Sequence, residues 1–166
     1  MEVEQMIDWY KRILEAALRG SYKSPIQAAV YDASPQHEEV IRAKGRQVLA
    51  EFVRPGMSVL DLGCGFGAVR SLLPWDVRYV GVDLFSVFIE EARRVFADFP
   101  TDKASFVEGD AVHVLLGMQP NSFDLAVSRE ITCDDPSLMD AALRVAPVYI
   151  VFSTGSERPV AVHRRK

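Results

Sequence analysis

The chain of 166 residues has only two cysteines, Cys64 and Cys133, and no long apolar run. Neither cysteine has a partner at metal-ligand spacing, so the sequence gives no metal site and no disulfide framework. A reducing, cytoplasmic setting is therefore expected. No stretch approaches the roughly 18 apolar residues of a transmembrane helix. The first residues, MEVEQMIDWY, are acidic and lack an apolar core, so no secretory signal peptide is expected.

An excess of positive charge is also missing. The formal net charge is −4 and the sequence pI is about 5.4. The single basic cluster, HRRK at 163–166, is typical of a solvated chain end. Since nucleic-acid-binding surfaces are basic, neither a nucleic acid nor a membrane is expected as a partner.

What the sequence does contain is an alternation of apolar and amphipathic segments. The apolar segments predict strands at 57–63, 77–84, 104–111, 123–129 and 147–154. Helical patterns lie between them at 67–73, 86–99, 111–117 and 136–146. Strands that are apolar nearly throughout are typical of a parallel sheet covered on both faces. The sequence therefore predicts an α/β fold, a three-layer sandwich with helices on both faces of an open sheet.

The region before the first strand has a different pattern. An amphipathic helix is predicted over 3–19, ended by Gly20, and a second helix begins at Ser34 and Pro35. We expect residues 1–45 to form a helical cap or lid, and residues 46–166 to form one compact ligand-binding domain.

Three glycines, Gly63, Gly65 and Gly67, follow the first predicted strand in the segment VLDLGCGFGAVRSLL, residues 59–73. One glycine would suffice for a strand-to-helix turn, so three indicate a ligand close to the backbone. Cys64 would be a small residue filling this turn. The segment GCGFGA also satisfies the loose dinucleotide-binding pattern G-x-G-x-x-G/A, which keeps a nicotinamide cofactor open at this point.

Acidic residues end three of the predicted strands. Asp61 would repel a pyrophosphate at the glycine turn and suits a ligand with a cationic centre. Asp83 can accept hydrogen bonds from both ribose hydroxyls of a nucleoside, as it would in a nicotinamide enzyme. Asp110 can accept from an adenine amino group or, alternatively, serve as a helix N-cap.

The segments VLDLGCGFG, YVGVDL, FVEGDA and FDLAVS, in this order, resemble the class I S-adenosylmethionine-dependent methyltransferases over residues 45–155. The resemblance implies S-adenosyl-L-methionine as cofactor and S-adenosyl-L-homocysteine as product. Asp61 would lie near the amino-acid end, Asp83 on the ribose, and Asp110 beside the adenine. The implied cofactor-binding residues are Asp61, Gly63, Cys64, Gly65, Gly67, Asp83, Leu84, Asp110, Ala111, Ser128 and Arg129, with Phe85 packing on the adenine beside Leu84.

The family sheet implies the strand order 3-2-1-4-5, but only a short segment follows the fifth strand. After the turn GSERP, the alternating segment VAVHRR predicts a sixth, antiparallel edge strand. Much of the usual acceptor pocket would then be missing. The N-terminal segment, with Tyr22 and Tyr31, and Glu130 would line it, or a second subunit of a homodimer would complete it.

The predicted function is methyl transfer from S-adenosylmethionine to an unidentified acceptor, with a small molecule as the default. The segment SREITCDDP lacks the N/D-P-P-Y/F motif of amino-methylating nucleic-acid enzymes. No catalytic residue is identified: Glu130 and His113 are the best-placed polar candidates, and Cys133 has no basic partner nearby. The alternatives are a non-catalytic sensor or partner subunit that binds S-adenosylmethionine or S-adenosylhomocysteine, and an NAD-dependent oxidoreductase, which Asp61 disfavours.

Overall fold

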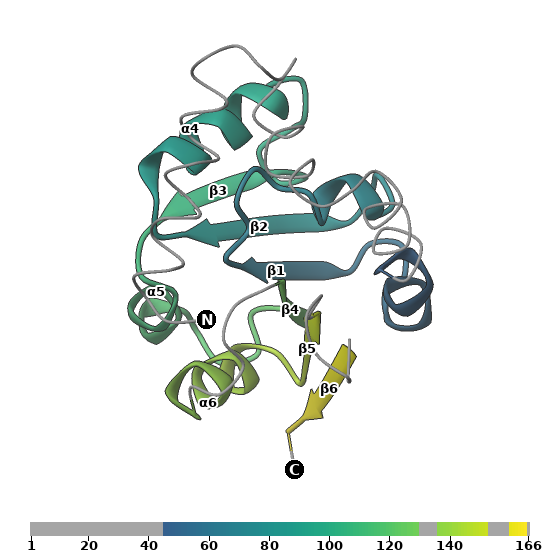
Figure 1. The fold of residues 1–166 in the computed structure, drawn as a ribbon. Coiled ribbons are helices and arrows are strands. Elements are labelled where there is room, and N and C mark those ends of the chain that lie inside the picture. The colour runs from purple at the N-terminus through teal and green to yellow at the C-terminus, as the bar shows by residue number, and fades with distance from the viewer. Residues whose placement is uncertain (1–44, 130–135, 153–159, 166) are drawn as a thin grey trace. The chain divides into compact units, whose positions relative to one another are not determined.

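A computed structural model describes residues 45–129, 136–152 and 160–165 (Figure 1). The chain divides into two compact units, Met1–Lys44 and Gly45–Lys166, and the described residues all belong to the second. Several predicted features lie outside the described residues: the helix over 3–19, the cap, Tyr22, Tyr31, Glu130 and Cys133.

Six strands form one sheet in the order β3-β2-β1-β4-β5-β6. The strands are β1 (Ser58–Leu62), β2 (Arg78–Asp83), β3 (Ser105–Glu108), β4 (Leu125–Arg129), β5 (Val148–Phe152) and β6 (Val160–Arg164). All neighbours pair in parallel except β5 and β6, which are antiparallel. The predicted strand order and the antiparallel edge strand are confirmed.

Helices cover both faces of the sheet, as Figure 1 shows. They are a helix over 45–52, α4 (Ser86–Val95), α5 (Ala111–Gly117) and α6 (Pro136–Val145). One apolar core joins the helix over 45–52 and α4 to the sheet through residues such as Leu49 and Ile89. The other joins α5 and α6 to the opposite face through residues such as Leu115 and Ala142. Each buried strand therefore contributes apolar side chains to both cores, which explains its continuous apolar sequence.

Two helical predictions differ from the structure. The helix predicted over 67–73 is a series of turns with a short 3-10 helix, η1 (Arg70–Leu72). Leu73, which precedes Pro74, is extended with ψ of 150°, because a following proline disfavours the helical conformation. The helix predicted over 86–99 ends at Val95.

The buried Arg70 stabilises the turn after η1. Its guanidinium donates hydrogen bonds to the carbonyl oxygens of Leu73, Pro74 and Trp75 at 3.0–3.3 Å, and to that of Lys103 at 2.7 Å. One side chain thus satisfies carbonyls that a longer helix would have paired internally. None of the helices in the described ranges has the length and apolar character of a transmembrane helix.

Candidate functional site

The glycine loop, residues 63–67, joins the carboxyl end of β1 to the turns before η1. The backbone N–H groups of Gly63 and Cys64 donate to the carbonyl oxygen of Val82 at 2.8 and 3.0 Å. The N–H of Gly67 donates to the carbonyl oxygen of Cys64 at 2.9 Å. These bonds fix the loop against the end of β2, where Asp83 is the last residue.

Asp83 holds the glycine loop from the neighbouring strand. Its Oδ2 accepts from the N–H of Gly65 at 2.9 Å, and its Oδ1 accepts from the N–H of Phe85 at 3.0 Å. Burial raises the pKa of this carboxyl, although the N–H groups of Phe85, Gly65 and Leu84 act in the opposite direction. Each carboxylate oxygen can accept two hydrogen bonds, so Asp83 keeps acceptor capacity for a ligand hydroxyl beside these N–H groups.

Gly65 and Gly67 face different surroundings. A Cβ atom on Gly65 would meet nothing within 4 Å, so this side of the loop is open. A Cβ atom on Gly67 would lie 2.8 Å from Phe96 Cε2 and 2.9 Å from Phe106 Cε1. Gly65 therefore leaves room for a ligand, whereas the missing side chain of Gly67 makes room for two core rings.

Asp61 lies beneath the same loop with its side chain buried in the sheet. The residue is 1% exposed, and its Oδ2 accepts a hydrogen bond of 2.6 Å from the hydroxyl of Tyr79. Tyr79 belongs to β2 and is itself fully buried. The Asp61 carboxyl group therefore sits at the carboxyl end of β1 with the Tyr79 hydroxyl as a hydrogen-bond donor.

The Cys64 side chain turns from the loop onto β2. A Cβ atom on Gly81 would come within 2.7 Å of the Cys64 Sγ, so only glycine fits at that position. Burial, together with the negative charges of Asp61 and Asp83, raises the pKa of the thiol far above its ordinary value. Both carboxylates therefore act on one point of the loop, and Cys64 stays protonated, packed in the turn.

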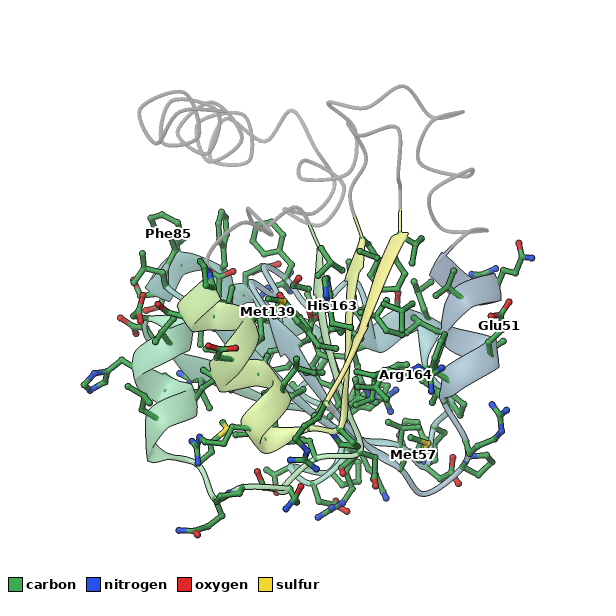
Figure 2. All side chains as sticks on the ribbon, turned by 90° about the horizontal axis from the view of Figure 1, so that it is seen from below. Glu51, Met57, Phe85, Met139, His163 and Arg164 are labelled. Atoms are coloured by element: carbon green, nitrogen blue, oxygen red, sulfur yellow. The ribbon has the colours of Figure 1, made fainter. Side chains whose placement is uncertain are left out.

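Apolar side chains extend this edge of the sheet beyond Asp83. Leu84 is 60% exposed, and the half-buried ring of Phe85 contacts Phe88 edge-on at 5.7 Å. Figure 2 shows Phe85 at the end of the molecule where the parallel strands terminate. These residues offer an apolar surface next to the Asp83 carboxylate.

Asp110 lies at the start of α5 and is exposed. Its Oδ1 accepts from the N–H of His113 at 2.9 Å, so it serves as the helix N-cap. The N–H of Gly109 donates to the carbonyl oxygen of Asp83 at 2.9 Å, which brings Asp110 and Ala111 next to the end of β2. His113 is exposed on α5.

Ser128, like Asp61, is buried and shares a hydrogen bond with a tyrosine hydroxyl. It pairs with Leu62 at the end of β1, but its side chain is fully buried and shares a hydrogen bond of 2.8 Å with the hydroxyl of Tyr149. The neighbouring Arg129 ends β4 opposite Phe152. Within the part of the chain that the structure describes, no group of three acidic, histidine or cysteine side chains could hold a metal ion.

Sequence reasoning missed Tyr79 and Gly81. Both lie inside β2, where a tyrosine and a glycine give no signal beyond that of a buried strand. The cross-strand register reveals them, because Asp61 pairs with Gly81, and Tyr79 lies two positions earlier on the same strand.

Known proteins resemble this chain in sequence and in fold. Residues 59–148 match the model of a family described as a methyltransferase domain. A sterol 24-C-methyltransferase of Gibberella zeae is 33% identical over 92 residues, which cover 52% of this chain and 23% of that protein.

Solved structures show the same fold. A putative S-adenosyl-L-methionine-dependent methyltransferase from Methanococcus maripaludis superposes with a TM-score of 0.62 at 18% identity, covering 76% of this chain and 61% of that one. A putative sarcosine dimethylglycine methyltransferase from Galdieria sulphuraria gives 0.57 at 19% identity, covering 73% and 48%. The chain thus spans about a quarter of the curated relative and about half to three fifths of these two structures.

The matched family model covers more than half of the chain and includes the glycine loop, Asp83 and Asp110. The sheet order with its antiparallel edge is that of the Rossmann-like methyltransferases. The chain therefore belongs to the class I S-adenosylmethionine-dependent methyltransferases.

Proposed function

We propose that this protein transfers a methyl group from S-adenosyl-L-methionine to a small-molecule acceptor. The observation that carries the proposal is the buried Asp83 carboxylate, which is hydrogen-bonded to Gly65 beside the open side of the glycine loop. It is an acceptor for a vicinal diol placed next to bare backbone, as the ribose of an adenosyl ligand requires.

The residues at this edge fit such a cofactor in three respects. Asp83 retains acceptor capacity for a ribose hydroxyl, and Leu84 and Phe85 offer an apolar surface for an adenine ring. Asp61 places a carboxyl group under the loop, which suits a ligand with an ammonium group, a cationic sulfur and no phosphate. Ala111 and the N-cap Asp110 would lie on the adenine side of the cofactor.

S-adenosylmethionine would supply a methyl group on a positively charged sulfur, transferred in line to the acceptor. The protein's contribution is alignment and the exclusion of water. The glycine loop and Asp83 would fix the adenosyl part, and Asp61 would lie near the ammonium group at the amino-acid end. Because burial keeps Cys64 protonated, its thiol is a poor nucleophile and would not compete with the acceptor.

The small-molecule acceptor is supported by charge and by the names of similar proteins. The net charge of −4 does not favour a nucleic acid as the acceptor. One relative is named for a sterol and one structural neighbour for sarcosine and dimethylglycine. Tyr22, Tyr31 and Glu130 remain the predicted acceptor-lining residues, with a second subunit as the alternative. The expected cytoplasmic setting also stays a prediction.

Titration calorimetry on the full chain tests the cofactor assignment. S-adenosylmethionine and S-adenosylhomocysteine should bind with micromolar or lower Kd, and NAD should not bind. Asp83→Ala should weaken binding by about 1–3 kcal/mol, because it leaves the ribose hydroxyls unpaired. Asp98→Ala, which removes an exposed aspartate beyond α4, is the matched control and should bind as the wild type does.

Turnover is tested separately by following S-adenosylhomocysteine formation with pools of small-molecule acceptors. Acceptor-dependent formation of S-adenosylhomocysteine would support the proposed methyltransferase activity. Binding without turnover in any pool would favour the non-catalytic sensor or partner subunit. Binding of NAD alone would reject the assignment.

A further inference from the structure

We propose that Tyr79 is a positioning residue that holds the Asp61 carboxylate for the amino-acid end of the cofactor. This inference rests on the proposed function and extends it to a residue that does not itself touch the ligand. The observation is a short hydrogen bond between two buried side chains of neighbouring strands, directly beneath the glycine loop.

The Tyr79 hydroxyl has a fixed role in this bond. Burial and the charge of Asp61 raise the tyrosine pKa well above its ordinary value, so the hydroxyl remains a donor. Its ring is fully buried and contacts the ring of Phe106 edge-on at 5.7 Å. The donor is therefore held in place by packing, at a distance of 2.6 Å from Asp61 Oδ2.

The Tyr79 bond matters because Asp61 is buried. A carboxylate that is 1% exposed loses most of its hydration, and each hydrogen bond to the charged form offsets part of that cost. The Tyr79 hydroxyl supplies one such bond to Oδ2 and fixes the direction in which this oxygen faces.

The two carboxylates then divide the ligand between them. Asp83 is bound to Gly65 and Phe85 and faces the open side of the loop, where it suits the ribose. Asp61 lies on the adjacent strand beneath the start of the loop and carries the other negative charge that acts on Cys64. The ammonium group at the amino-acid end of an adenosyl ligand is the group that this second carboxylate complements.

A pair of ligands separates this role from a purely structural one. S-adenosylhomocysteine carries the amino-acid end, whereas 5′-methylthioadenosine is an adenosyl thioether without it. Tyr79→Phe removes only the hydroxyl and should weaken binding of S-adenosylhomocysteine about tenfold. Binding of 5′-methylthioadenosine should change by less than about twofold, because its contacts lie on the Asp83 side.

Val77→Ala is the matched control for lost stability. Val77 is fully buried in the same core, just before β2, and its truncation leaves the Asp61 bond intact. It should bind both ligands as the wild type does at a temperature well below its unfolding midpoint. If Tyr79→Phe does not fold, Asp61→Asn supplies the second test, because it keeps the shape of the side chain and removes its charge; it should show the same selective loss.

The possible results are distinct. A selective loss for S-adenosylhomocysteine supports the inference. Equal weakening of both ligands, or unchanged binding of both, in Tyr79→Phe or in Asp61→Asn would overturn it while the proposed function stands. Failure of the wild type to bind either ligand would instead refute the proposed function.

Discussion

Replacing Gly65 or Gly67 with alanine adds one methyl group to the same loop, but the two variants should fail in different ways. Gly65 has φ of 52° and open space where the methyl group would lie. Gly67 has φ of 79°, and its methyl group would enter the contact distance of two aromatic rings. The first variant should lose ligand affinity and the second should lose stability.

The magnitudes follow from these surroundings. An alanine in the left-handed region costs about 1–2 kcal/mol, and both variants carry this cost. Gly67→Ala also forces Phe96 and Phe106 apart, and overpacking of this kind costs about 1–3 kcal/mol more. The two rings contact each other at 5.5 Å in the core, so neither can move without disturbing its neighbour. Gly67→Ala should therefore be less stable than Gly65→Ala by about 1–3 kcal/mol.

Gly56→Ala is a control for the backbone cost alone. Gly56 has φ of 80°, has nothing within 4 Å of its added methyl group, and precedes β1 at the end opposite the glycine loop. Urea unfolding should give Gly56→Ala and Gly65→Ala similar losses of stability. Calorimetry with S-adenosylhomocysteine should show wild-type affinity for Gly56→Ala and at least about tenfold weaker binding for Gly65→Ala, since the ligand occupies the open side.

Two results would refute this reasoning. Wild-type affinity in Gly65→Ala would mean that no ligand lies against the open side of the loop. Equal stability of Gly65→Ala and Gly67→Ala would mean that the aromatic rings do not require the missing side chain of Gly67.

Two further outcomes concern Asp83 and Arg70. Burial raises the Asp83 pKa above its ordinary value of 3.8. Between pH 3.8 and the pKa of the folded state, the folded protein therefore binds more protons at Asp83 than the unfolded protein does. As the pH rises through this window, the Asp83 contribution to the stability of the free protein should fall, while affinity for S-adenosylhomocysteine should rise. Urea unfolding and calorimetry of wild type and Asp83→Ala at several pH values measure both trends. A stability contribution of Asp83 that rises with pH would contradict the expectation. Arg70→Lys keeps the charge but loses the planar group that bonds to four carbonyls, so urea unfolding should show a loss of about 1–3 kcal/mol, and wild-type stability would show that these bonds contribute nothing.

The sheet could be predicted from the sequence because its central strands are buried on both faces. Largely apolar runs marked the five parallel strands, and the alternating segment after 159 marked β6. The helix predicted over 67–73 was wrong. Its apolar spacing is helical, but the Arg70 side chain donates to the carbonyl oxygens of Leu73 and Pro74 in the turn that follows. Pro74 also holds Leu73 in an extended conformation. The local sequence does not show which carbonyl oxygens a buried arginine will bind, so it could not predict that turns would replace the helix.

The site was predictable where residues stand at strand ends. Parallel strands end at one edge of a sheet, so Asp61 and Asp83 were expected near each other, and both act on Cys64. Tyr79 and Gly81 could not be recognised, because their importance comes from the side chains opposite them on β1 and in the loop. The residue roles toward a cofactor remain predictions.

The most direct test of the central claim is a crystal structure of the full chain with S-adenosylhomocysteine. The account predicts that both ribose hydroxyls donate to Asp83 at about 2.5–3.0 Å, with the ligand against the open side of Gly65. A ligand bound elsewhere, or ribose hydroxyls that do not contact Asp83, would contradict it.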